Sequence, residues 1–130
     1  MKFTRISFLF VLILLCVPSA ALAQSSASKS WNSFWTSFVA TVRSKGHSGI
    51  QKLMAPKVQF SDGEVSPNTA VQYLDNANGE LWVQVRKSVA TGTKPYRSSG
   101  GKPMRVTGNN LLVFEREKNG QWKWAGFMGD

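Results

Sequence analysis

The clearest pattern along the chain is a run of apolar residues at helical spacing between positions 31 and 42. Ser28 or Ser30 can cap the start of such a helix, and Gly46 lies just beyond its end. Residues three or four positions apart share one face of a helix, so this run predicts an amphipathic helix that packs an aromatic side against a core. The apolar positions are Trp31, Phe34, Trp35, Phe38, Val39 and Val42.

Two short elements are predicted to follow this helix. Residues 48–55 have the spacing of a second helix, and Pro56 ends it because proline lacks the amide that a helix interior needs. Residues 58–60 are predicted to form a strand, and Asp62-Gly63 is predicted to turn the chain.

A third helix is predicted to open at Ser66 and Pro67, because serine caps free amides and proline is tolerated in the first turn. We expect Asn78-Gly79 to end this helix. Its apolar side comprises Ala70, Val71, Leu74 and Ala77.

Residues 80–91 fit two patterns. Every second residue from 81 to 85 is apolar, as in a strand, whereas the apolar positions from Trp82 to Val89 also fit a helical stripe that Gly92 ends. We favour the helix and keep the strand as the alternative.

The last third of the chain is predicted to be a loop followed by a hairpin. Residues 92–108 are rich in glycine, proline, serine and basic residues, which favours a long loop with a short strand at 104–107. Residues 111–117 and 121–128 are rich in strand formers, and the turn at 118–120 joins them. Helices first and paired strands last predict an α+β fold, with N-terminal helices packed on an antiparallel sheet. The expected core comprises Phe34, Trp35, Phe38, Leu112, Phe114, Trp122 or Trp124, and Phe127.

The N-terminal segment has the features of an export signal. Lys2 and Arg5 form a basic start, residues 8–17 are apolar, and Ala21-Leu22-Ala23 forms a small-residue cleavage site. We therefore predict cleavage before Gln24 and a secreted or periplasmic protein.

Two other fates of this segment are weaker. A retained membrane anchor needs about 20 apolar residues, and Pro18 and Ser19 end the run too early. Lipid attachment at Cys16 would need a small residue before it, where bulky Leu15 stands. We therefore divide the chain into a signal peptide (1–23), a flexible lead (24–30) and one α+β domain (31–130), with no transmembrane segment after cleavage.

Cleavage changes the composition of the chain. Cys16 is the only cysteine, so the mature chain cannot form an internal disulfide. Two of the 16 basic residues and none of the 7 acidic ones are lost, which leaves 14 basic residues and a net charge of +7. This charge favours anionic partners such as an envelope component. It would also favour nucleic acid, but export away from the cytoplasm argues against that partner.

Few residues are candidates for catalysis. His47 is the only histidine, and no nucleophile stands beside it in the sequence. An isomerase-type site would need a carboxylate and a hydroxyl at an apolar pocket, for which Asp62 or Asp75 with Tyr73 or Tyr96 are available. One histidine and no mature cysteine leave no recognisable zinc or iron ligand set. We therefore predict no catalytic residue, no metal site and no cofactor.

The segment from 94 to 105 is the best candidate binding site in the sequence. It holds four basic residues and one tyrosine with no acidic residue between them. Arginine binds carboxylate or phosphate through paired hydrogen bonds, and a tyrosine face can stack on a ring. This basic loop comprises Lys94, Tyr96, Arg97, Lys102 and Arg105.

The order of these patterns resembles small bacterial exported domains of the nuclear-transport-factor-2-like, or cystatin-like, superfamily. The similar segments are WNSFWTSFVATV, IQKLMAP, VQFSDG, TAVQYLDN and the ending LLVFEREKNGQWKWAGFMGD. The resemblance implies a curved sheet that wraps a helix into a cone with an apolar pocket. A helix at 80–91 departs from the superfamily, which generally places a strand after the third helix.

The superfamily includes binding domains as well as ketosteroid-isomerase-like and dehydratase-like enzymes, so the fold does not select the function. We expect an exported, noncatalytic domain that binds a small apolar ligand or an anionic envelope component. A pocket enzyme of isomerase or dehydratase type is the alternative.

Overall fold

The computed structural model describes the backbone of residues 19–128 and the side chains from Ser30 onward. Most of the predicted signal peptide, with Cys16, therefore lies outside the described residues, and cleavage before Gln24 stays a prediction. Within the described part, no helix has both the length and the apolar character needed to cross a bilayer.

Helix α1 (Ser19–Ser44) is longer than the sequence pattern indicates. It includes residues 24–30, for which we expected a flexible lead. Once the packed turns of a helix have formed, each further residue adds one hydrogen bond at little extra cost, so a serine-rich stretch can continue it. The predicted aromatic face is confirmed: Trp31, Phe34 and Phe38 are buried, whereas Trp35 is only partly buried.

The second helix ends earlier than predicted. Helix α2 (His47–Lys52) gives way to strand β1 (Met54–Phe60), so Pro56 lies inside a strand and does not stop a helix. The Leu53 carbonyl accepts a hydrogen bond from the Trp124 amide at 2.7 Å, which draws the chain into the sheet at this point. The residues of β1 next to Pro56 have an irregular register, the kind of place where a strand tolerates proline.

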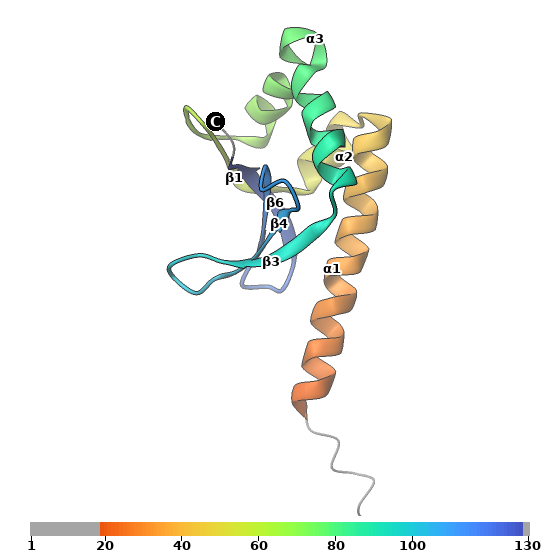
Figure 1. Ribbon diagram of the computed structural model, residues 1–130, viewed down its shortest axis with the longest axis vertical. Coiled ribbons are helices and arrows are strands. Elements are labelled where there is room, and N and C mark those ends of the chain that lie inside the picture. Colours follow the sequence, from red (N-terminus) through yellow and green to blue (C-terminus); the bar gives the residue numbers. More distant parts are fainter. Residues whose placement is uncertain (1–18, 129–130) are drawn as a thin grey trace, which may run out of the picture.

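The α+β fold is confirmed, but its sheet is mixed and not purely antiparallel. Six strands lie in the order β2-β1-β6-β5-β4-β3. Strand β1 pairs with β6 (Trp122–Phe127) in parallel, and all other neighbours are antiparallel. The sheet is curved and unclosed, and the helices lie along one side of it (Figure 1). The remaining strands are β2 (Gly63–Val65), β3 (Thr93–Arg97), β4 (Pro103–Thr107) and β5 (Leu112–Arg116).

Strand β3 is the element that the sequence analysis missed. It pairs with β4 over five residues, so the expected long loop from 92 to 108 is largely a hairpin. Four of its five side chains are exposed, and the strand contains Pro95, so neither alternation nor composition marks it as a strand. The predicted strand at 104–107 and the C-terminal hairpin are confirmed.

Helix α3 (Pro67–Ala90) begins as predicted, with the Ser66 side chain accepting from the Thr69 amide. The helical interpretation of residues 80–91 is confirmed for 80–90, and β3 follows at once. The predicted break at Asn78-Gly79 is present: residues 76–79 are non-helical and separate two helical segments, which together form α3. Ala77, expected on the apolar side of this helix, is exposed at the kink.

Hydrogen bonds anchor the C-terminal end of α3 to the turn between β4 and β5. The Asn109 side chain donates to Ser88 Oγ at 2.9 Å and accepts from Thr107 Oγ1 at 2.7 Å. Ser88 and Thr107 are both fully buried, so these polar groups are satisfied within the protein. This contact fixes the second half of α3 over the sheet.

The space between helices and sheet is filled by a single aromatic core. Phe38 packs edge-on against Phe114 and Trp124, with ring centroids 5.0 and 5.4 Å apart. Phe127, expected in the core, is only partly buried. The expected core members that are fully or nearly fully buried are Phe34, Phe38, Leu112, Phe114, Trp122 and Trp124.

Candidate functional site

A hollow of about 470 Å³ lies between α3 and one end of the sheet. Its apolar part comes from both layers: Leu81 lies on α3, and Leu111 and Phe127 lie at the end of the β5–β6 hairpin. Polar groups of Asp62, Tyr73, Glu80 and Gln84 also line it. We call this site, together with Phe60, Ser61, Asn76 and Ala77, the kink hollow.

The kink in α3 forms part of the wall of this hollow. Asn76 adopts an extended conformation, and the next three residues have positive φ angles of 52°, 56° and 75°. Asparagine and glycine tolerate the left-handed region, but Ala77 does so at a cost of about 1–2 kcal/mol. Such strain persists only where neighbouring contacts enforce it, and it is often found at functional sites.

The Asp75 side chain makes a hydrogen bond that spans the kink. Its Oδ1 accepts from Trp82 Nε1 at 2.9 Å, which joins the two halves of α3, and it lies 3.1 Å from His47 Nε2 at the start of α2. The hydrogen bond from Trp82, followed by the charge and hydrogen bond of His47, holds the pKa of Asp75 below its usual value. His47 and Asp75 therefore hold helices together at an exposed position, and neither lines the kink hollow.

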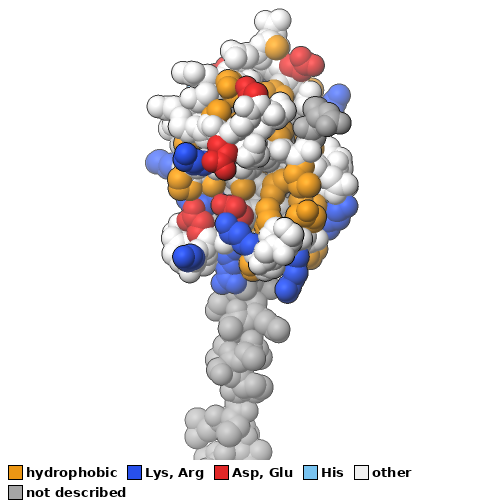
Figure 2. Space-filling view, turned by 90° about the vertical axis from the view of Figure 1, so that its left-hand side faces the viewer, with side chains coloured by type: hydrophobic (Ala, Val, Ile, Leu, Met, Phe, Trp, Pro, Cys, Tyr) orange, Lys and Arg blue, Asp and Glu red, His pale blue; other side chains and the backbone are white. Residues whose placement is uncertain are grey.

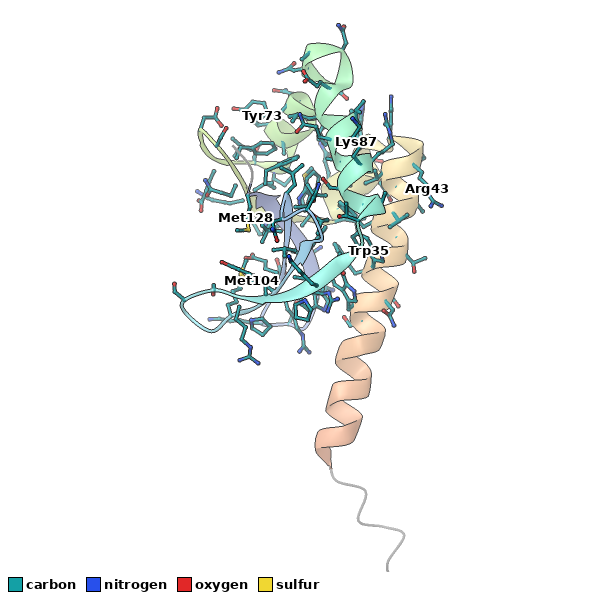
Figure 3. The ribbon with its side chains drawn as sticks, viewed as in Figure 1. Trp35, Arg43, Tyr73, Lys87, Met104 and Met128 are labelled. Carbon is teal, nitrogen blue, oxygen red and sulfur yellow. The ribbon has the colours of Figure 1, made fainter. Side chains whose placement is uncertain are left out.

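Asp62 and Tyr73 meet at the rim of the kink hollow. The Tyr73 hydroxyl donates to Asp62 Oδ2 at 3.3 Å. The Tyr73 ring packs edge-on against Phe60 at 5.0 Å, and Phe60 in turn contacts Phe127 at 4.9 Å. Tyr73 lies on α3 close to the turn between β1 and β2, which carries Asp62 (Figure 3). Of the carboxylate and hydroxyl candidates, this is the one pair that the described structure brings together by hydrogen bonding.

The basic loop does not form one patch. Residues alternate between the two faces of a strand, so Lys94 and Tyr96 lie on the face away from the helices, and Arg97 and Arg105 on the other. Lys102 forms an ion pair with Glu115 at 3.0 Å. Strand pairing thus separates the five residues that lie close together in the sequence.

The Arg105 side chain contacts β3 and α1. Its Nε and Nη2 donate to Thr93 Oγ1, each at 3.2 Å, and its guanidinium lies 4.8 Å from the centre of the Trp31 ring. Burial lowers the pKa of Arg105. This side chain supports the packing of the hairpin on α1 and has little freedom to recruit a separate ligand.

A second hollow, of about 560 Å³, lies on the face of the sheet away from the helices. Met104 and Met128 lie on this side of the sheet (Figure 3), and Tyr96 and Met128 are two of the described protein's exposed large apolar side chains. Three charged residues, Lys57, Glu64 and Glu115, share its lining with these apolar groups, on the face of the molecule that Figure 2 shows.

Sequence reasoning missed Glu80 and Gln84 as site residues. Helical spacing could not have identified them, because the non-helical residues 76–79 interrupt the period between Tyr73 and Leu81. No protein-family model, curated protein or solved structure matches this chain, so its own residues must indicate the function.

Proposed function

We propose that this chain is a noncatalytic binding domain for a small apolar ligand that carries a cationic or hydrogen-bond-donating group, with the kink hollow as its site. The observation that carries the proposal is the Tyr73–Asp62 hydrogen bond beside an apolar wall. The volume of about 470 Å³ lies within the range of small-molecule sites, roughly 300–1,000 Å³.

The charge of the hollow supports a cationic ligand. The chain has 16 basic and 7 acidic residues, yet the lining includes Asp62 and Glu80 and no lysine or arginine. An anion would meet two carboxylates here, whereas an amine could form charge-assisted hydrogen bonds with them. The ligand expected at this site is therefore the small apolar one and not the anionic envelope component.

Two features favour binding over isomerase-type catalysis. Asp62 is exposed to water, whereas a carboxylate that acts as an acid or base at neutral pH is usually shielded by apolar groups. The Tyr73 hydroxyl already donates to Asp62, so this donor is not directed at a reacting oxygen.

We also propose an exported member of the nuclear-transport-factor-2-like superfamily. Helices along one side of a curved sheet support this proposal, as does β3 directly after α3. A helix at 80–91 was expected to depart from the superfamily pattern of a strand after the third helix. In this chain the third helix is longer and kinked, and a strand still follows it. Intact-mass analysis of the recovered protein tests export: a chain that starts at Gln24 supports it, and retention of residues 1–23 contradicts it.

The binding proposal can be tested with three naphthalene probes of similar size. Calorimetric titration with 1-naphthylmethylamine, 1-naphthylmethanol and 1-naphthoate compares a cation, a neutral donor and an anion. We expect the amine to bind best. Asp62→Asn should weaken amine binding about tenfold or more, because a hydrogen bond to a charged group is lost, and should affect the alcohol much less.

Glu64→Gln provides the matched control. Glu64 lies on β2, close to Asp62 in sequence, but lines the hollow on the other face of the sheet. Equal losses in the two variants, or equal affinity for all three probes, would contradict the proposal. Turnover of an enolisable ketone that Asp62→Asn abolishes would replace binding by the isomerase alternative.

A further inference from the structure

A separate hollow of about 610 Å³ lies at the opposite end of the β5–β6 hairpin from the kink hollow. Arg116 ends β5, and the turn that follows contributes Lys118 and Gly120. Lys102, from the loop between β3 and β4, completes its basic lining. We call this site, together with Pro103 and Glu117, the turn hollow.

Arg116 lacks the partners that a partly buried arginine normally has. Its Nε is buried with no hydrogen-bond acceptor among the described residues, and neither of the ion pairs found there includes it. Trp122, its register partner on β6, has a buried Nε1 that is also without an acceptor. Two neighbouring unsatisfied N–H donors are costly, and such groups in a native protein call for a physical explanation.

The turn at Gly120 lies close to the Arg116 guanidinium. Gly120 has φ +85°, and a side chain there would begin 3.6 Å from Arg116 Nη2. The turn is held in place by the Gly120 amide, which donates to the Glu117 carbonyl, and by the Gly120 carbonyl, which accepts from Ser30 Oγ at 3.2 Å. The guanidinium therefore lies beside a fixed turn and not on a free surface.

The charges around the turn hollow have one predominant sign. Three basic side chains line it against one acidic side chain, Glu117. Lys102 is partly neutralised by Glu115, on the other face of β5, whereas Lys118 is exposed on the turn. Lys and Arg side chains gather at the lower end of the described domain in Figure 2.

We propose that the turn hollow binds a phosphate group, with Arg116 as the principal contact and Lys102 and Lys118 as supporting charges. A guanidinium presents paired donors that match phosphate oxygens, and lysines add point charges around it. The anion would offset a charge that has no carboxylate partner within the described chain. This site differs from the basic loop in that Arg97 and Arg105 take no part.

Nitrogen-15 NMR of the full chain tests this directly, because the Arg116 Nε–H and the Trp122 indole N–H give resolvable signals. Titration with inorganic phosphate and with glycerol phosphate should shift the Arg116 signal in a saturable manner. Arg116→Gln should weaken binding about tenfold or more, since it removes a charged donor. Lys118→Gln, on the exposed turn, should weaken it several-fold without disturbing the fold.

Arg43→Gln is the matched control. Arg43 is exposed on α1, in the helical layer and away from the sheet (Figure 3), so the same charge is lost without a change in the turn hollow. Equal weakening by Arg43→Gln and Lys118→Gln would mean nonspecific attraction and would overturn the proposal.

The source of the phosphate is distinguished by vesicle sedimentation. Binding to phosphatidylglycerol vesicles but not to phosphatidylcholine vesicles, lost in Lys118→Gln, would identify a lipid headgroup. Saturable binding of glycerol phosphate without vesicle binding would identify a soluble phosphate ester. If neither ligand binds, the proposal is wrong. The kink hollow is unaffected by these substitutions, so either proposal can fail without the other.

Discussion

Replacing Phe38 with alanine should remove the centre of the aromatic core. The side chain is 0% exposed and contacts four other rings, with centroid distances between 5.0 and 5.9 Å. Truncation of a buried phenylalanine costs roughly 3–5 kcal/mol. Because each aromatic pair adds about 0.5–1.5 kcal/mol beyond the buried area, we expect a loss near the upper end, about 4–5 kcal/mol.

Such a loss is a large part of the stability of a small domain, which is about 5–15 kcal/mol. A change of 1 kcal/mol moves the melting temperature of a domain of this size by about 4–8 °C, so Phe38→Ala should lower it by at least about 15 °C. Urea denaturation followed by tryptophan fluorescence measures the free energy of unfolding, and calorimetry measures the melting temperature. Tyr96→Ala is the control, because Tyr96 is 40% exposed on the far face of the sheet. If the two variants unfold together, α1 does not pack on the sheet as described.

Three further predictions concern the backbone and the helix contacts. Ala77→Gly should raise the free energy of unfolding by about 0.5–1 kcal/mol in urea denaturation, because relief of left-handed strain exceeds the entropy cost of glycine; a loss of stability would contradict the strain. Gly126→Ala should lower the free energy of unfolding by about 2 kcal/mol or more, because the new Cβ would lie 2.8 Å from the Gln59 amide nitrogen. An unchanged urea denaturation curve would show that the two backbones do not approach so closely. Because the pKa of Asp75 is lowered, its ionised form stabilises the fold at pH values above the ordinary pKa of 3.8, and this stabilisation is lost as the pH falls through the lower pKa of the folded state. The difference in unfolding free energy between the parent and Asp75→Asn should therefore become smaller in acid. A difference that becomes larger in acid would contradict the lowered pKa.

Local patterns predicted the elements whose side chains have one buried face. The aromatic stripe of α1, the Ser66 cap of α3 and the strand formers of the last two strands each depend on residues close together in the sequence. The sequence pattern of residues 80–90 fits a helix and a strand almost equally well. In the folded chain these residues are helical, and a hydrogen bond from distant Asn109 to Ser88 holds the helix in place. Strand β3 has no buried face, so nothing in its own sequence identified it.

The candidate sites show the same division. Asp62 and Tyr73 could be named as a carboxylate and a hydroxyl, but only the packing of α3 against the β1–β2 turn brings them within 3.3 Å. The basic loop looked like one patch because its charges are adjacent in sequence, and strand pairing distributed them over two faces. Arg116 attracted no attention in the sequence, since its lack of partners is a property of the folded chain.

By itself, the sequence determined the α+β class, the aromatic helix, the C-terminal hairpin and the strongly basic charge, because hydrophobic period, turn residues and composition act over a few neighbouring positions. Only the tertiary structure decided the parallel pairing of β1 with β6, the kink of α3 and the residues that share each hollow. These features depend on contacts between segments far apart in the chain, which no pattern of neighbouring residues specifies.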